Sequence, residues 1–298
     1  MIDFRLKVFQ SVAKNLSFTK AAQELFISQP AVTKHIQELE SNYNTRLFER
    51  NGNSISLTEA GKLLQKHCIY ILDAYKQLDY EMYLLQEMQQ GELRLGASTT
   101  IAQYVLPPLL GNFISKFPQI KLSLLNGNSR DIETALQQHH IDLGLVEGYQ
   151  QLPTLHYEKF LKDELVAIVS THSELSNTLP DEITAKELLD IPLVLRERGS
   201  GTLDIIEHAL QQQDIRIADL HVLLYLGNTE GIKLFLQNAN CMGIVSFRSI
   251  TKELKAGLFR IIEIKDLDMF RYFNFVCLQG EKNNLTQMFM DYFQHHFR

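Results

Sequence analysis

The chain has 298 residues and a net charge of −6, so it is long enough for two or three domains. Hydrophobic residues make up 45% and charged residues 21%, as in globular proteins, and no apolar run approaches the roughly 20 residues that cross a bilayer. The start, MIDFRLKVF, lacks a signal-peptide pattern and the three cysteines lack CxxC spacing, which predicts a cytoplasmic protein without a membrane anchor, disulfides or a metal site.

The acidic charge is unevenly distributed along the chain. Residues 1–60 carry a net charge of +1, and the remainder carries −7. If the N-terminal part binds nucleic acid, it must therefore use several weak phosphate contacts from paired subunits, because it has no large basic surface.

The first predicted helix covers residues 3–14 and belongs to a small helical unit. Its apolar residues recur at helical spacing, which predicts one inward face. The predicted inward residues are Leu6, Phe9, Val12 and Ala13, with Leu16 just beyond the helix.

Two short helices separated by a tight turn follow. Ser17 is an N-cap candidate for a helix over Thr19–Leu25. Phe26 and Ile27 break the helical pattern, and we expect both to fill the corner. Ser28 is the N-cap candidate of the next helix.

The helix after Ser28 has one apolar and one polar face. Pro30 fits its first turn, where a missing N–H costs nothing. The apolar face consists of Val32, Ile36 and Leu39. The opposite face carries Gln29, Thr33 and Gln37, with Lys34 beside them. These side chains can read base edges in a major groove and hold a phosphate, although a solvated surface would have the same composition.

A hairpin and a long helix follow. The Asn51-Gly52-Asn53 turn between extended segments predicts a small wing, with Arg50 near its tip. Thr58 is expected to cap a helix whose apolar residues recur at intervals of four and three. They are Leu64, Cys68, Ile71, Tyr75, Leu78, Met82 and Leu85. This heptad pattern predicts a dimerising coiled coil rather than a helix packed on its own domain.

The segments SFTKAAQELFISQPAVTKHIQELE and LFERNGNSISLTEAGK resemble the N-terminal domain of LysR-type transcriptional regulators. The resemblance implies promoter DNA as a partner, a homodimer or a tetramer built from two dimers, and RNA polymerase as a further candidate partner. It also implies that the wing arginine touches DNA. The candidate DNA-binding residues are Gln29, Pro30, Thr33, Lys34, Gln37, Arg50 and Thr19.

From Glu92 onward, predicted strands and helices alternate, which indicates an α/β domain with mostly parallel strands. The predicted strands are Leu93–Ala97, Ile120–Leu125, Leu143–Val146, Leu165–Ser170, Pro192–Leu195, Val222–Leu226, Gly243–Phe247 and Tyr272–Gln279. The predicted helices are Ile101–Phe117 (interrupted or restarted at Pro107-Pro108), Asp131–His139, one from Leu203, one from Glu230, and Leu285–Phe297.

The family resemblance supplies the expected topology, which is a periplasmic-binding-protein-like (type 2) domain with two lobes. The complete fold prediction is an all-α winged helix-turn-helix, a coiled-coil linker helix and this two-lobed α/β effector domain. The predicted boundaries are 1–58, 59–90 and 91–298, with the first lobe at about 91–161 and 267–298 and the second at about 162–266.

Ligands of parallel α/β sheets bind beyond the carboxyl ends of the strands. Several predicted strand–helix junctions carry hydroxyl and amide groups beside helix N-termini, where an anion can bind. Each group also suits an ordinary helix cap. The candidate effector-binding residues are Ser98, Thr99, Thr100, Asn128, Glu147, Arg196, Ser200, Gly201, Thr202 and Asn228.

Glu147 is the exception in this otherwise anion-friendly set. A carboxylate there disfavours a bare anion unless it pairs with an arginine or the ligand also carries an amine. The segments GASTTIAQYVLPPLL, GLVEG, RERGSGT and GNTEGIKLF resemble regulators of sulfur assimilation and sulfite reduction, which implies sulfite, sulfate or a related small anionic metabolite as effector. No cofactor is expected beyond this effector.

Two other functions remain open from the sequence. The first is an enzyme with an accessory DNA-binding domain, but the chain has no P-loop, GxSxG or HExxH motif, so we expect no catalytic residues and no enzymatic activity. The second is an architectural DNA-binding protein without an effector, which would leave a domain of roughly 200 residues with a purely structural role.

Overall fold

The computed structural model describes residues 3–51, 54–85, 91–148, 151–280 and 284–296; some side chains of the wing tip and of the long helix are also outside this description. The chain divides into two compact units, Met1–Glu87 and Met88–Arg298. Each unit is described by itself.

The first unit begins with three helices whose starts are set by side-chain caps. Its helices are α1 Phe4–Asn15, α2 Phe18–Leu25 and α3 Gln29–Tyr43. Ser17 accepts a hydrogen bond from the Lys20 N–H and Ser28 accepts one from the Ala31 N–H, so both predicted caps are confirmed.

The apolar face of α3 packs into the core of this unit. Val32, Ile36 and Leu39 are all buried, as predicted. They share one hydrophobic cluster with residues of α1 and α2, among them Phe9 and Ala21. The polar row of α3 is therefore turned away from the core.

Leu16 and Phe26 differ from the prediction that they lie inside. Each residue ends a helix in the left-handed region, with φ of 45° and 53°. The Phe26 N–H donates to the carbonyls of Ala22 and Gln23, which closes α2, and its side chain is 63% exposed. Leu16 is 48% exposed. Helix termination decides the direction of these two side chains.

The predicted wing is a two-stranded antiparallel hairpin. It consists of β1 Phe48–Asn51 and β2 Ser54–Leu57, with Phe48 opposite Leu57 and Asn51 opposite Ser54. This register leaves a two-residue connection, 52–53, which is outside the described residues. Ile55 and Leu57 pack against the helical core.

Helix α4, Glu59–Leu85, begins after Thr58, whose hydroxyl accepts the Gly61 N–H at 3.0 Å. Cys68 is fully buried in the core of its own unit, and its Sγ lies 3.3 Å from the Leu6 carbonyl oxygen. This differs from the prediction of one uninterrupted dimer seam. Leu78 and Met82, further along the helix, are 49% and 50% exposed.

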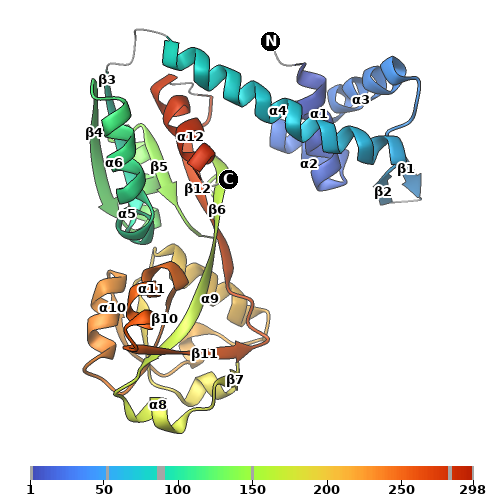
Figure 1. The fold of residues 1–298 in the computed structure, drawn as a ribbon. Helices are drawn as coiled ribbons and strands as arrows, with labels where there is room; N and C mark the ends of the chain where they lie inside the picture. Colours follow the sequence, from blue (N-terminus) through green and yellow to red (C-terminus); the bar gives the residue numbers. More distant parts are fainter. Residues whose placement is uncertain (1–2, 52–53, 86–90, 149–150, 281–283, 297–298) are drawn as a thin grey trace. The chain divides into compact units, whose positions relative to one another are not determined.

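The second unit is built on a sheet whose order is β4-β3-β5-β12-β6-β10-β8-β9, with β11 paired to β6 and β7 to β11. Its two halves form two lobes (Figure 1). The first lobe contains β3 Gly91–Ser98, β4 Ile120–Gly127, β5 Leu143–Val146, α5 Thr99–Tyr104, α6 Leu106–Lys116, α7 Ser129–Gln137 and α12 Asn284–His296.

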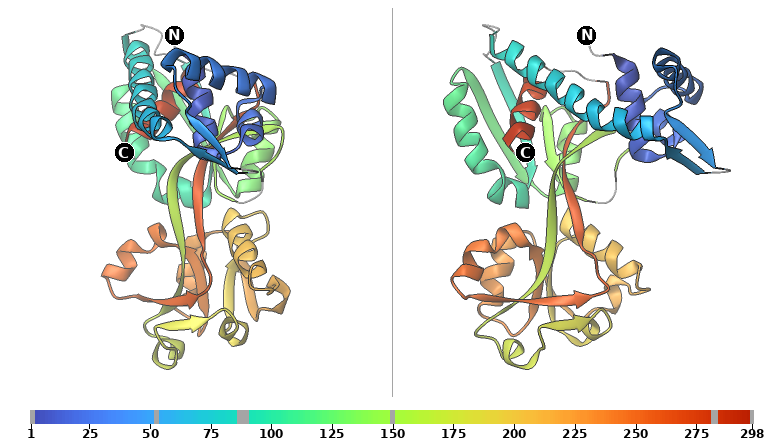
Figure 2. Two further views of the ribbon diagram at one scale, coloured as in Figure 1. Left: turned by 90° about the vertical axis from the view of Figure 1, so that its right-hand side faces the viewer. Right: turned by 45° about the vertical axis from the view of Figure 1, so that its right-hand side comes forward.

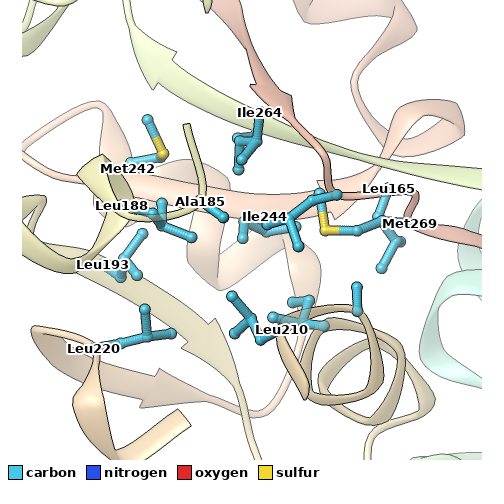
Figure 3. Packing of buried hydrophobic residues seen from close by; sticks show 14 of the residues in the cluster. Leu165, Ala185, Leu188, Leu193, Leu210, Leu220, Met242, Ile244, Ile264 and Met269 are labelled. Carbon is cyan, nitrogen blue, oxygen red and sulfur yellow. The ribbon is translucent and has the colours of Figure 1, made fainter. Parts of the chain in front are cut away.

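The second lobe contains β7 Glu182–Thr184, β8 Leu193–Arg196, β9 Val222–Leu226, β10 Met242–Ser246, β11 Phe259–Lys265, α8 Glu174–Thr178, α9 Gly201–Gln211, α10 Thr229–Leu236 and α11 Thr251–Lys255. Short 3₁₀ turns occupy Glu187–Asp190 (η1), Ile217–Asp219 (η2) and Phe247–Ser249 (η3). Leu193, Leu210, Met242 and Ile244 are among the residues that pack in its core (Figure 3).

Two long antiparallel strands join the lobes. They are β6 Leu155–Ser170 and β12 Phe270–Leu278, which run side by side between the lobes in all views (Figure 2). The sheet is therefore mixed: β3, β4 and β5 are parallel, as are β8 and β9, but the crossover strands pair antiparallel with their neighbours. The prediction missed the first ten residues of β6 and all of β7 and β11. The predicted helix over Ile101–Phe117 is interrupted at Val105 rather than at Pro107.

Candidate DNA-binding surface and effector site

The N-terminal half of α3 presents a polar surface. Gln29, Pro30, Lys34 and Gln37 are exposed and Thr33 is half-buried. The Gln29 Nε2 donates to the Thr33 Oγ1 at 3.1 Å. The two side chains therefore form a pair on the helix surface, with their remaining donors and acceptors available to a ligand.

Two other candidate DNA contacts lie outside α3. Thr19 is exposed in the first turn of α2. The backbone of Arg50 belongs to β1, but its side chain is not among the described residues, so its predicted role stays a prediction.

The candidate effector residues of the first lobe gather where β3 and β5 end. Ser98, Thr99 and Thr100 are buried at the β3–α5 junction. The Ser98 hydroxyl donates to the carboxylate of Glu147, which follows β5 and is also buried. The Thr99 hydroxyl donates to the Gly127 carbonyl at 3.1 Å, so it secures the loop after β4.

A buried arginine on β12 completes this cluster. The Arg271 Nη1 lies 3.4 Å from the Glu147 Oε1 and donates to the Thr202 Oγ1 at 2.9 Å. Its Nε donates to the Asp163 Oδ2 at 2.8 Å. Thr202 belongs to α9 of the second lobe, so Arg271 links groups from both lobes and from the crossover strands.

The N-terminus of α9 closes against the end of β5. Ser200 and Thr202 are buried, and the Ser200 Oγ accepts the Thr202 N–H at 3.2 Å. A Cβ atom added to Gly201 would lie 1.9 Å from the Glu147 carbonyl oxygen, so only glycine permits this approach. Gly199, with φ of +88°, makes the preceding turn beside Asn128.

Three other candidates have structural partners. Asn128 and Asn228 cap α7 and α10 by accepting the Asp131 and Gly231 N–H groups. Arg196 is buried and donates to the Glu197 carboxylate at 2.8 and 3.0 Å. In the described part of the chain, Arg196 contacts Glu197 and Gly227 and Asn228 contacts Gly231, so neither joins the Arg271 cluster through these bonds.

A second contact joins the lobes at Tyr104. Its hydroxyl donates to the carboxylate of Glu230 on α10, and Glu230 also pairs with the Lys233 Nζ at 2.7 Å. Burial and then the Glu230 carboxylate raise the pKa of Tyr104. Burial would raise the pKa of Glu230, but hydrogen bonds from Lys233 and Tyr104 outweigh it and lower that pKa.

A pocket of about 780 Å³ opens between α7 and α9 and reaches Glu147 and Gly148. Arginine and carboxylate side chains both line it, including Arg130, Arg198 and Asp204. Burial raises the pKa of Asp204, with Glu207 adding to the effect. The pocket is therefore polar and carries both signs of charge.

Sequence reasoning missed Arg271 and Asp163. Both are buried charges within strand segments, Arg271 in FRYFNF of β12 and Asp163 in LKDELV of β6. A charge inside an apolar strand is costly unless it is paired, so Arg271 by itself signals a partner elsewhere in the fold, whereas Asp163 stands between Lys162 and Glu164 and gives no such signal.

Among the described residues, no group of three or more His, Cys, Asp and Glu side chains is placed to hold a metal ion. Within the same residues, no helix combines the length and the apolar character needed to cross a membrane.

Comparisons with known proteins agree with this architecture. Residues 4–62 match the family model for bacterial regulatory helix-turn-helix proteins of the lysR family, and residues 86–298 match the LysR substrate binding domain. The chain is 33% identical to a probable RuBisCO transcriptional regulator of Cyanidioschyzon merolae, over 90% of this chain and 88% of that protein. It is 29% identical to the HTH-type transcriptional regulator CysL of Bacillus subtilis, over 93% and 92%.

The second unit also resembles a solved structure. The regulatory domain of CcmR from Synechocystis PCC6803, in complex with 2-PG, is 29% identical with a TM-score of 0.62, covering 70% of this chain and 98% of that domain.

Proposed function

The chain belongs to the LysR family of transcriptional regulators, and we propose that its α3 residues read promoter DNA while a small metabolite binds between the lobes of its second unit. The observation that carries the DNA-binding proposal is the orientation of α3: its apolar face is buried and its polar face is exposed. In this role Gln29, Thr33 and Gln37 contact base edges.

Phosphate contacts supplement this base readout. Lys34, Thr19 and Arg50 are the proposed phosphate contacts, which position the helix without reading sequence, and Pro30 is a proposed van der Waals contact beside them. The mildly basic N-terminal region requires that two subunits bind together, on half-sites separated by a whole number of helical turns. We propose that exposed apolar residues of α4 hold this homodimer or tetramer together.

The effector is proposed to bind where Ser98, Thr100, Glu147 and Thr202 converge. Support comes from their burial at strand and helix ends and from the pocket of about 780 Å³, which Glu147 lines. CcmR, whose regulatory domain is similar, was solved with 2-PG, which supports a small-molecule ligand. Sulfite and sulfate stay predictions that rest on the sequence resemblance. An effector acts only through different affinities for two lobe arrangements.

We further propose that the protein acts in the cytoplasm, with RNA polymerase as a candidate partner. Its family consists of transcriptional regulators, so we propose no catalytic activity and no cofactor besides the effector.

The test is genome-wide mapping of bound DNA in the native host for the wild type and for Gln29→Ala. Loss of a base contact costs about 1–3 kcal/mol, so Gln29→Ala should lose or change its sites. Gln237→Ala, the same substitution at an exposed residue of the second unit, is the matched control. An unchanged binding map for Gln29→Ala would show that α3 does not read the sequence.

A further inference from the structure

We propose that the effector is a small hydroxy- or amino-carboxylate rather than a bare oxyanion, and that Arg271 and Glu147 read its two ends. This inference rests on the proposed effector site between the lobes. It adds the chemical class of the ligand and a residue, Arg271, that the sequence did not indicate.

The first observation is the unused donor capacity of Arg271. Its side chain is fully buried, its Nε serves Asp163 and its Nη1 serves Thr202 and Glu147. The Nη2 has no hydrogen-bond partner among the described residues, although it is shielded from solvent. Charge-assisted hydrogen bonds from a guanidinium group to an anionic oxygen are strong, so this nitrogen suits one anionic oxygen of a ligand.

Thr100 supplies a second unused group nearby in the fold. Its Oγ1 is buried and has no hydrogen-bond partner in the described part of the chain. Thr100 lies two residues after Ser98, whose hydroxyl binds the same Glu147 that contacts Arg271. Buried polar atoms normally find partners, because leaving one unpaired costs about as much as a lost hydrogen bond.

The second observation is the uneven pairing of the two carboxylates beside Arg271. Asp163 receives hydrogen bonds from the Arg271 Nε and the Ser246 hydroxyl, each at 2.8 Å, and Arg248 lies 3.6 Å away. Glu147 receives the Ser98 hydroxyl and a longer Arg271 contact of 3.4 Å. Glu147 is therefore the less compensated carboxylate and keeps acceptor capacity.

These two observations select a ligand with both kinds of group. Sulfate offers only acceptor oxygens, which satisfy Arg271 but face the charge of Glu147. A hydroxyl or ammonium group next to a carboxylate can donate to Glu147 while the carboxylate accepts from Arg271. The adjoining pocket reaches Glu147 and carries Arg130 and Arg198 as well as Asp204, which suits a molecule with both donor and anionic groups.

The experiment uses the full-length protein and matched pairs of acids in isothermal titration calorimetry. The pairs are glycolate and acetate, L-lactate and propionate, and L-malate and succinate, with glycine, L-serine, sulfate and sulfite as further probes. A hydrogen bond to a charged group changes affinity by roughly tenfold or more. We expect at least one hydroxy- or amino-acid to bind tenfold tighter than its partner lacking that group.

Three variants test the assignment of the ends. Glu147→Gln should reduce the preference for the hydroxyl or ammonium group without weakening the deoxy acid, because the neutral amide oxygen accepts a weaker hydrogen bond than a carboxylate. Thr100→Val should weaken the preferred acid severalfold with little change in fold. Arg271→Lys keeps the positive charge but loses the guanidinium group, and should weaken the binding of all carboxylates. Glu164→Gln, an exposed position on β6, is the matched control and should bind like the wild type.

Three results would each overturn the proposal. They are equal affinities within every pair, sulfate or sulfite binding at least as tightly as the best acid, and no binding of any hydroxy- or amino-acid. DNA affinity, measured by fluorescence anisotropy on a mapped site in the same samples, separates this failure from a wider one. If the protein still binds DNA in a Gln29-dependent way, the proposed regulatory function stands and only the proposed ligand class fails. If it does not bind DNA, both proposals fail.

Discussion

Gly201 places the backbone of α9 directly against the backbone of Glu147. A Cβ on residue 201 would lie 1.9 Å from the Glu147 oxygen and 2.4 Å from its carbonyl carbon. Neither atom can move aside by a side-chain rotation, so Gly201→Ala must separate α9 from the end of β5. We expect a loss of about 1–3 kcal/mol in the free energy of unfolding and weaker effector binding. Denaturant melts and calorimetry measure both.

Gly227→Ala is the matched control for this prediction. Apart from its two chain neighbours, no described residue has an atom within 4 Å of the Cβ position of residue 227, so the added methyl group meets open space. We expect this variant to melt and bind like the wild type. A Gly201→Ala protein that binds its effector as tightly as Gly227→Ala would show that the lobes do not need this contact.

The pair formed by Gln29 and Thr33 suggests that the two residues read DNA as a unit. The Gln29 amide donates to the Thr33 hydroxyl at 3.1 Å, which orients its remaining acceptor and donor outward. Thr33→Val should therefore weaken specific binding even if only Gln29 touches a base. We expect each single variant to lose about 1–3 kcal/mol of specific affinity and the double variant to lose less than the sum.

A double-mutant cycle in mobility-shift assays measures this coupling. Nonspecific DNA is the internal control, because loss of base readout leaves phosphate contacts in place. Strictly additive losses on the specific site would mean that Gln29 and Thr33 act independently.

At the residue scale, local rules predicted some features and could not predict others. The caps Ser17 and Ser28 follow from hydrogen bonds within four residues, so the sequence is sufficient for them. Phe26 was placed wrongly because its left-handed backbone turns the side chain outward. Arg271 was missed because its partners lie 69 and 108 residues away in the chain, at Thr202 and Asp163.

At the element scale, α4 combines two tasks in one apolar stripe. Its first half packs on its own unit through Leu64, Cys68 and Leu72. Ile71, beside this packed segment, and Leu78 and Met82 further along the helix are substantially exposed. A periodic pattern alone cannot separate these tasks, because packing on a neighbouring helix and packing on a second copy need the same spacing.

The exposed half of the stripe predicts the oligomeric state. Leu78→Glu places a charge in the proposed coiled-coil seam, where it would be buried without a partner. We expect the mass in light scattering to fall to that of a smaller assembly, with the melting curve of the second unit unchanged. DNA binding should weaken because half-sites would be contacted singly.

Leu234→Glu is the matched control, since Leu234 is an exposed leucine on a different helix, α10. It should leave the mass unchanged. If Leu78→Glu also leaves the mass unchanged, α4 is not the dimer contact.

Apolar strands were predicted from the sequence, whereas the polar strand segment between the lobes was not. The strands β3, β5, β8 and β10 are short apolar runs, and each was predicted to within a few residues. The first part of β6, LHYEKFLKDE, reads as polar because it crosses between the lobes and is covered only in part. Its strand character comes from pairing with β12, which is more than 100 residues later.

At the scale of the second unit as a whole, the two lobes are joined covalently by β6 and β12 and non-covalently by a few contacts. The register between these strands shifts at Phe273 and Asn274. Because few contacts join the lobes, small changes in these contacts can shift the balance between the two proposed lobe arrangements, and with it the apparent affinity for the effector.

The contact between Tyr104 and Glu230 provides a test of this coupling. Tyr104→Phe removes one hydroxyl and leaves Glu230 paired with Lys233. Because Glu230 is half-exposed, we expect a loss of only about 1 kcal/mol, which is roughly a fivefold weaker effector affinity. Hydrogen exchange of α5 and α10 should increase together, since both faces of the contact are released.

The pH dependence adds an internal check. The pKa of Tyr104 is raised and that of Glu230 is lowered, so neither group titrates between about pH 6 and 8 and the difference between variants should stay constant there. On acidification, the stabilisation from ionised Glu230 is lost as the pH falls through its lowered pKa, and the effector affinities of the wild type and Tyr104→Phe should converge.

Tyr272→Phe, an exposed tyrosine on β12, is the control and should change neither affinity nor exchange. Faster exchange in α5 alone would mean that Tyr104 stabilises its own helix and does not hold the lobes together.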